Sequence, residues 1–224
     1  MVSTVDGRLR RAAATREHIL DTAERLFAER GVVAVSNRQI SEAAGQGNTA
    51  AVGYHFGTKA DLVRAIARRH ADDIERRRKL LLARTDPAAG VREWVACLVR
   101  PVTEHLGSLG VPSWYARFGA QLATDPALRG ILTDQALTTP SLREVVDRLN
   151  RRLPDLPLEV HAERAEMAGQ LLVHMCAERE RALARGAPTA KPDWHGTATG
   201  LIDAITAIWH AEVTPAEVAG GEAE

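Results

Sequence analysis

Hydrophobic residues recur every three or four positions along most of the chain. The first such series is Ile19, Ala23, Leu26 and Phe27. This spacing places the apolar side chains on one face of a helix. Thr15 is suited to the N-cap of that helix and Gly31 to its end. We therefore predict a first helix that begins at Thr15.

Shorter helices follow this first one. Ser36 is suited to cap a second helix of barely two turns, and Gly45 and Gly47 mark a tight turn after it. Asn48 is suited to cap a third short helix over 49–54. After a glycine at 57, a long helix is expected over 59–84.

The remainder of the chain is a series of helical patterns interrupted by Gly and Pro. These patterns cover residues 88–106, 114–123, 126–137, 142–153, 158–185 and 194–212. Alternating runs of Val, Ile and Thr, which are typical of strands, do not recur. The sequence therefore predicts an all-α fold.

Composition adds the expected environment of the protein. The chain has 224 residues, of which 45% are hydrophobic, and its apolar stretches are shorter than the roughly 18 residues of a membrane span. Its first residues lack the apolar core of a secretion signal, so we expect a cytoplasmic protein without a membrane partner. The two cysteines, Cys97 and Cys176, lie within helical patterns, which favours buried thiols over a disulfide or a metal site.

Charge is distributed unevenly although the net charge is zero. Residues 1–84 hold 16 basic and 10 acidic residues, a net charge of +6, and the rest hold 13 and 19, a net charge of −6. The N-terminal part therefore suits a polyanionic partner. The histidines are scattered and the common catalytic and nucleotide-binding motifs are absent, so we expect no enzyme, no catalytic residue and no cofactor.

The segment 36–59, SNRQISEAAGQGNTAAVGYHFGTK, combines two short helices with a glycine turn. This is the arrangement of a helix-turn-helix, whose second helix must be slim to enter a major groove about 12 Å wide. The small residues at 50, 51 and 53 meet that requirement. An αα-hairpin without DNA is the alternative for such a turn, and the rest of the segment favours DNA.

The segment resembles the TetR family of bacterial transcriptional regulators. The resemblance rests on the cap Ser36, the pair Ala44-Gly45, the trio Tyr54-His55-Phe56 and the pair Thr58-Lys59. It implies an N-terminal three-helix DNA-binding domain followed by a larger helical domain that binds a ligand and dimerises. Two departures are the turn AGQGN, one residue longer than the family's common form, and Gly53 in place of an aromatic residue.

The resemblance also implies which residues meet DNA. Ser36 and Arg38 would reach phosphates, residues 48–51 would face base edges, and the last residues would position the backbone. The expected DNA-binding residues are Ser36, Arg38, Gln46, Asn48, Thr49, Ala50, Ala51, Gly53, Tyr54, His55, Thr58 and Lys59. The small recognition face indicates readout through thymine methyl groups and DNA shape as well.

Two apolar stripes in the last helices either pack on each other or continue across a two-fold axis as a four-helix bundle, as the resemblance implies. The expected interface residues are Ala168, Leu172, Met175, Leu201, Ile205, Ile208 and Trp209.

The middle helices hold most of the aromatic residues, which either form ordinary core or line an apolar cavity with a few polar groups. The expected ligand-binding residues are Trp94, Cys97, His105, Trp114, Tyr115, Phe118, His174 and Met175.

These expectations define four segments and one function. We expect a disordered basic arm over 1–14, a helix-turn-helix domain over 15–58, a ligand-binding and dimerisation domain over 59–212 and a disordered tail over 213–224. The function is that of a homodimeric regulator, a repressor that a small apolar or amphipathic effector releases from double-stranded operator DNA. The alternative is a helical small-molecule-binding protein or enzyme with a vestigial helix-turn-helix.

Overall fold

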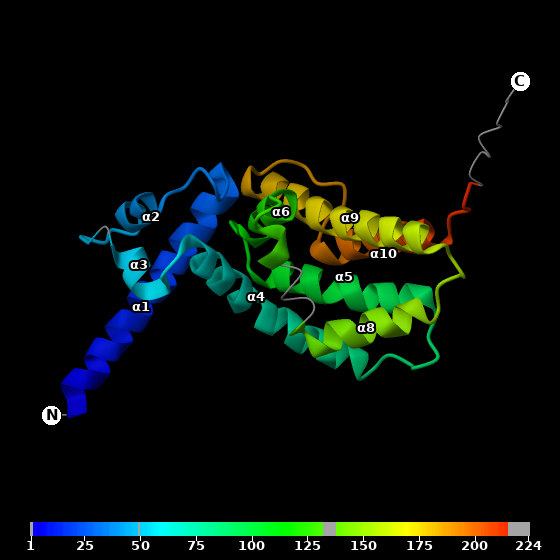
Figure 1. Cartoon of the computed structure of the whole chain (residues 1–224), viewed down its shortest axis with the longest axis horizontal. Coiled ribbons are helices and arrows are strands. Elements are labelled where there is room, and N and C mark those ends of the chain that lie inside the picture. Colours follow the sequence, from blue (N-terminus) through cyan, green and yellow to red (C-terminus); the bar gives the residue numbers. More distant parts are fainter. Residues whose placement is uncertain (1, 49, 132–137, 215–224) are drawn as a thin grey trace, which may run out of the picture.

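The computed structural model describes residues 2–48, 50–131 and 138–214. Over these ranges the fold is all-helical, as the sequence predicts, and no strand is present. The helices are α1 (Val2–Arg30), α2 (Asn37–Ala43), α3 (Ala51–Phe56), α4 (Lys59–Leu82), α5 (Val91–Ser108), α6 (Tyr115–Thr124), α8 (Pro140–Asn150), α9 (Leu158–Ala184) and α10 (Trp194–His210). None of these helices is long and apolar enough to cross a bilayer. Helices α1 to α3 lie at one end of the molecule and α5 to α10 at the other, with α4 running between them (Figure 1).

The N-terminal end of α1 differs from the sequence-based expectation. The helix begins at Val2, so residues 2–14 are helical and the expected disordered arm is wrong for them. The physical reason is composition, because Ala12, Ala13 and Ala14 and the preceding arginines favour helix strongly and no Gly or Pro intervenes after Gly7. In the predicted helix over 126–137, residues 132–137 lie outside the described residues. In the predicted tail over 213–224, residues 215–224 do so as well.

The first hydrophobic core joins the three N-terminal helices to their neighbours. Ile19 and Phe27 of α1, Ile40 of α2 and Val52 of α3 are all fully buried in it. The first turns of α4 contribute Leu62, Val63 and Ile66, and α6 contributes Phe118 and Leu122. The expected domain boundary after residue 58 therefore does not coincide with a break in packing.

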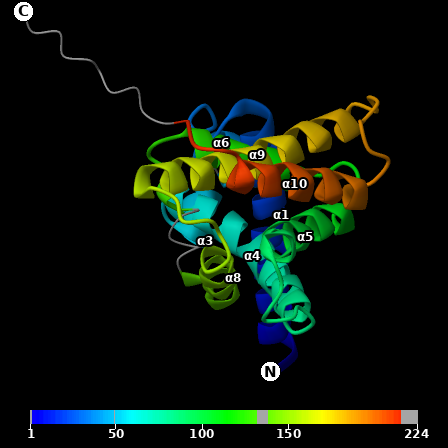
Figure 2. The ribbon, with the colours of Figure 1, turned by 90° about the vertical axis from the view of Figure 1, so that its right-hand side faces the viewer.

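The second core lies within the larger domain. It packs α5 against α8, α9 and α10, with Trp94, Val95, Ile202 and Ile205 among its buried residues. Helices α9 and α10 run side by side across the bundle, with α5 and α8 below them (Figure 2). This core separates the surface of α9 and α10 from the N-terminal helices.

Two buried arginines of α9 fix the ends of α10. Arg164 donates to the carbonyl oxygens of Trp209 and Ala211, at 3.1 and 2.6 Å, beyond the last turn of α10. Arg179 donates to the carbonyl of Lys191 at 2.8 Å and lies over the ring of Trp194 at the first turn. Helix C-termini leave carbonyl groups without partners, so the Arg164 guanidinium satisfies groups that would otherwise need water. The two helices therefore form one unit.

Helix α6 is held on α9 by one buried carboxylate. Glu180 is 1% exposed and accepts hydrogen bonds from the Ser113 hydroxyl (2.9 Å), the Ala116 amide (3.2 Å) and the Arg117 amide (3.0 Å). Its Oε2 also pairs with Nε of Arg117 at 3.1 Å. A carboxylate at a helix N-terminus satisfies free amide groups and complements the positive end of the helix dipole.

We expect Glu180→Ala to destabilise the protein by about 3–5 kcal/mol, because removal of one partner leaves the Arg117 charge and the α6 amides buried without an acceptor. Urea denaturation measures the change. The matched control is Glu166→Ala, which removes an exposed carboxylate of the same helix and should cost about 0–1 kcal/mol. Equal effects of the two substitutions would contradict the role of Glu180.

Candidate DNA interface

Helix α2 begins with a capping box. The Ser36 hydroxyl accepts a hydrogen bond from the amide of Gln39 at 3.2 Å, and the Gln39 side chain accepts one from the amide of Ser36 at 2.8 Å. Such a box satisfies amide groups at a helix N-terminus. The predicted cap is therefore confirmed. Arg38 lies on the exposed face of the same turn and pairs with Glu42 at 2.7 Å.

The turn after α2 is held by its own polar groups. Gly45 has a φ of +63°, a value that favours glycine. The side chain of Gln46 donates to the carbonyl of Ala44 at 3.0 Å, and Oδ1 of Asn48 accepts the amide of Ala50 at 2.9 Å. The expectation that Asn48 is the N-cap is wrong, since α3 begins at Ala51 with Ala50 at the cap position. The Asn48 side chain instead stabilises the turn that leads into the helix.

Helix α3 buries one side and exposes the other. Ala51 and Val52 are 7% and 0% exposed and belong to the first core, whereas Tyr54 is 85% exposed. Gly53 and Ala50 are also exposed, and a Cβ at Gly53 would have no neighbour within 4 Å. The implied contact of Ala51 with base edges is therefore wrong, because the later start of α3 turns this residue inward. The open side is slim, as entry into a major groove requires.

The start of α4 lies beside α3. The Thr58 hydroxyl accepts the amide of Asp61 at 3.1 Å and donates to its carboxylate at 2.6 Å. The pKa of Asp61 is lowered by hydrogen bonds to its carboxylate, most strongly from the Thr58 side chain and next from the Thr58 backbone amide. The ammonium group of Lys59 donates to the carbonyls of Val32 and Val33, at 3.1 and 3.4 Å, and so ties α4 to the loop before α2.

Most of the expected DNA-binding residues lie together along α2, the turn and α3. Thr49 lies outside the described residues. The sequence-based expectation did not include Arg16, whose guanidinium lies over the ring of Phe56 at 4.7 Å from its centroid. This contact places α1 beside the last residue of α3.

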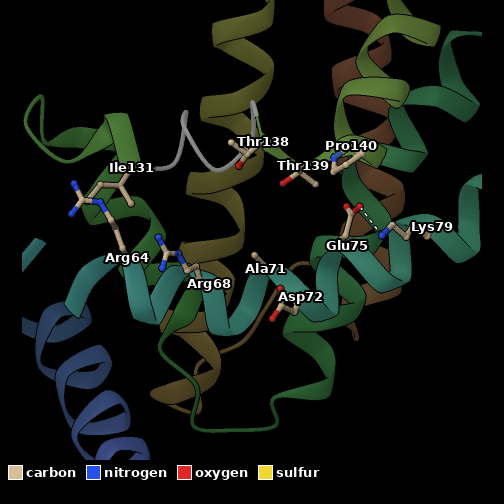
Figure 3. A pocket seen from close by; sticks show the side chains of 10 residues that line it. All are labelled: Arg64, Arg68, Ala71, Asp72, Glu75, Lys79, Ile131, Thr138, Thr139 and Pro140. Atoms are coloured by element: carbon tan, nitrogen blue, oxygen red, sulfur yellow. Dashed lines mark ion pairs between the residues drawn. The ribbon is translucent and has the colours of Figure 1, made fainter. Parts of the chain in front are cut away.

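A pocket of about 440 Å³ lies on the side of α4 that faces the start of α8. One face of α4 forms its floor, and residues 131 and 138–140 lie opposite (Figure 3). The α4 residues that line it are Arg64, Arg68, Ala71, Asp72, Glu75 and Lys79. Lys79 pairs with Glu75 at 3.4 Å, and Glu75 also accepts the hydroxyl of Ser141. The pocket is polar at both ends, and no residue of the expected ligand set lines it.

The structure does not bring the expected ligand-binding residues together. His105, Tyr115 and Phe118 are neighbours, with ring centroids 5.7 and 6.5 Å from Tyr115. Trp94 and Cys97 belong to the second core, and Trp94 donates to the carbonyl of Ala89 at 3.0 Å. Trp114 packs against the first core. His174 and Met175 lie on the outer face of α9. Helical spacing cannot distinguish these places, because the residues come from α5, α6 and α9, and the spacing within one helix does not show which neighbour its apolar face meets.

The outer face of α9 and α10 carries an apolar groove of about 450 Å³. Leu171 and Met175 of α9 and Gly200 and Ala204 of α10 line it. Of the expected interface residues, Met175 is exposed and Ala168, Leu172 and Ile208 are half-buried. Leu201 is 4% exposed but lines the groove. Ile205 and Trp209 are wrong as surface residues: they are 2% and 3% exposed and belong to the second core, which the helical pattern of α10 alone does not reveal.

Comparisons with known proteins agree with this arrangement. Residues 19–66 match the family model "Bacterial regulatory proteins, tetR family", and residues 96–207 match "Tetracyclin repressor-like, C-terminal domain". The chain is 31% identical over 150 residues to the HTH-type transcriptional repressor AcnR of Corynebacterium efficiens, over 65% of this chain and 73% of AcnR. The TetR family transcriptional regulator PfmR from Thermus thermophilus has the same fold, with a TM-score of 0.51 and 17% identity over 89% of this chain and 98% of PfmR.

The fold and the helix-turn-helix define a DNA-binding transcriptional regulator. The chain belongs to the TetR family of bacterial transcriptional regulators. The resemblance inferred from residues 36–59 is thereby confirmed, and it extends into the larger domain, where the sequence motifs were uninformative.

We expect Tyr54→Ala to weaken binding to all DNA sequences alike, by about 1 kcal/mol, while leaving stability unchanged because the side chain is exposed. Anisotropy titrations with a labelled duplex measure the affinity. Since tyrosine is neutral, the salt dependence of binding should stay the same. Tyr54→Phe serves as the control that isolates the hydroxyl group. An affinity equal to that of the wild type for both variants would remove Tyr54 from the interface.

Proposed function

We propose that the protein is a homodimeric repressor that binds operator DNA through α2 and α3 and leaves it when a small amphipathic effector binds the larger domain. The observation that carries the proposal is the two-sided character of α3. Its inner side is packed into the first core, while Tyr54, Gly53 and Ala50 remain open. A packing helix would bury such a tyrosine, whereas a recognition helix must expose it to the groove.

The outer face of α9 and α10 is the proposed dimer interface. Its groove is mostly apolar, and the small residues Gly200 and Ala204 in the lining permit two helix pairs to approach closely. A two-fold axis through this face would bring the same residues of both copies together. It would also set the spacing between the two copies of α3, which is what a palindromic operator reads.

The proposed effector site is the pocket on α4. Its floor lies on the helix whose first residues, Thr58 and Lys59, border the DNA interface. An effector that prefers one position of α4 would shift the population of DNA-competent dimers. The charged ends of the pocket and its apolar members, Ala71, Ile131 and Pro140, suit an amphipathic molecule.

For the dimer, we expect Ala204→Glu to produce a folded monomer, because a carboxylate in the apolar groove would lose its hydration on dimerisation. Sedimentation velocity measures the oligomeric state, and circular dichroism confirms the fold. Ala162→Glu is the matched control, because residue 162 is exposed and lies on the opposite side of α9 from the groove residue Leu171. The two residues are nine positions apart, and at 100° per residue this separation places them half a turn apart around the helix. A folded dimer for Ala204→Glu would place the interface elsewhere.

For the effector, thermal-shift measurements over a library of amphipathic compounds should identify a ligand that binds less tightly when operator is saturating. By linkage, a ligand that weakens DNA binding tenfold binds the DNA complex tenfold more weakly, about 1.4 kcal/mol of coupling. We expect Ala71→Trp to fill the pocket and abolish binding of this ligand without affecting DNA binding. If Trp114→Ala abolishes it and Ala71→Trp does not, the effector site lies beside α6 instead.

A further inference from the structure

A chain of four titratable side chains crosses the junction between α1 and the larger domain. Nε2 of His70 lies 2.9 Å from Oε2 of Glu24, Nδ1 of His70 lies 2.8 Å from Nε2 of His105, and Nδ1 of His105 lies 2.8 Å from Oδ2 of Asp73. Glu24 belongs to α1, His70 and Asp73 to α4, and His105 to α5. Glu24 and the two histidines are 4–5% exposed. The chain therefore links three helices, and its first two contacts are buried from water while Asp73 at its end is partly exposed.

The three contacts require three protons. Each distance is that of a hydrogen bond, which needs one proton between its two heavy atoms. Two neutral imidazoles carry only two N–H groups, and an ionised carboxylate carries none. If His70 donates to Glu24 and His105 donates to Asp73, then two bare nitrogen atoms face each other at 2.8 Å and their lone pairs repel. A third proton between the rings removes this conflict.

Both carboxylates of the chain are paired with arginine side chains. Arg69 donates to Glu24 and to Asp21, and it also lies 3.7 Å from Glu17. A guanidinium in contact with a carboxylate stabilises its charge. The third proton is therefore not needed on Glu24.

Asp73 is bound more extensively. Arg77 donates to it at 2.6 Å, Arg76 pairs with it as well, and Arg77 in turn lies 3.9 Å from Glu104. Burial acts to raise the pKa of Asp73, but the hydrogen bonds from Arg77, His105 and Arg76 outweigh it and hold that pKa well below its ordinary value. The third proton thus belongs to the pair of imidazoles.

The surroundings favour a charge on the His70 side of the pair. The ring of Tyr115 from α6 stacks on His70, with centroids 3.8 Å apart and an angle of 17° between the planes. An aromatic face stabilises a neighbouring cation. Burial lowers the pKa of His105, the hydrogen bond to Asp73 opposes this effect, and electrostatic repulsion from the neighbouring His70 ring adds to it. Arg78, the other buried cation near Tyr115, donates to the carbonyl of Cys97 and pairs with Glu75.

We propose that His70 and His105 share one proton, and that this proton holds α1 against α5 in the arrangement that binds operator DNA. The regulatory half of the proposal rests on the proposed function. When the proton is lost, the two bare nitrogen atoms repel each other, the His70 ring turns to donate its remaining N–H to His105, and its contact with Glu24 of α1 breaks. The tie between the DNA-binding helices and the larger domain is then released, and operator affinity falls at alkaline pH.

The sign of the pH dependence follows from the number of bound protons. In the unfolded chain each imidazole has its ordinary pKa of about 6.5. The two rings together therefore hold one proton at about pH 6.5, fewer at higher pH and up to two at lower pH. The folded pair keeps one proton to a higher pH than the unfolded chain does, and a second proton would set two N–H groups against each other. Stability therefore falls as pH rises above about 6.5, where the folded state binds more protons, and also as pH falls below it.

Nuclear magnetic resonance of the protein labelled with ¹⁵N in its histidines tests the shared proton without any substitution. At pH 7.5 we expect three protonated ring nitrogens on His70 and His105, with intermediate shifts for the two nitrogens that face each other. Two neutral rings that titrate independently near pH 6.5 would overturn the shared proton.

Denaturation as a function of pH tests its contribution to stability. Between pH 7.5 and 8.5 the unfolding equilibrium constant of the wild type should rise about threefold relative to that of His105→Gln, whose amide replaces a ring contact without titrating. His210→Gln, an exposed histidine of α10, is the control and should follow the wild type. Parallel curves for the wild type and His105→Gln would overturn the proposal.

Operator binding tests the regulatory half. With a duplex recovered by selection from a random pool, wild-type affinity should fall at least threefold more than that of His105→Gln between pH 7 and 8.5. If operator affinity depends on pH equally in the wild type and in His105→Gln, the proposed effect of the proton on DNA binding is overturned. The magnetic resonance experiment then still decides whether the proton is shared. If no duplex is recovered at all, the proposed function fails, and the two tests without DNA still decide the proton.

Discussion

The buried carboxylate of Glu180 and the ring of Phe118 fix the two sides of α6, and the relation between the two halves of the molecule depends on them. Glu180 binds the first turn of α6 to α9. Phe118, one turn later, stacks on Phe27 of α1 with ring centroids 6.2 Å apart. Because tightly packed helices move together, a shift of α9 carries α6 with it and so reaches α1. The surface that we assign to the dimer and the helices that we assign to DNA are thus mechanically connected.

The fold was largely predictable because its caps and breakers are local. Ser36 and Thr58 each start a helix through contacts with the residue three positions later, and such contacts are written in the sequence. The beginning of α1 was not predictable in this way. No cap separates residues 2–14 from the amphipathic part of the helix, and the absence of an apolar pattern there was mistaken for an absence of helix.

The site was predictable only where one segment contains it. Residues 36–59 fold as one unit, so their spacing predicted the helix-turn-helix, although α3 begins later than expected and Ala51 is buried. The larger domain assembles its surfaces from distant helices, and a helical pattern does not say which neighbour an apolar face meets. Ile205 was therefore assigned to a dimer and packs within the protomer, while Trp94 and Met175 were assigned to one cavity and lie apart.

The central claim is that the open side of α3 reads DNA in a two-fold dimer. Selection of bound duplexes from a random pool, followed by titration of the recovered sequence at several salt concentrations, tests it most directly. The account predicts an inverted repeat whose half-sites are about 10 base pairs or a multiple apart, and an affinity that falls steeply as salt rises. Recovery of no common sequence, with binding no tighter than to the starting pool, would contradict it.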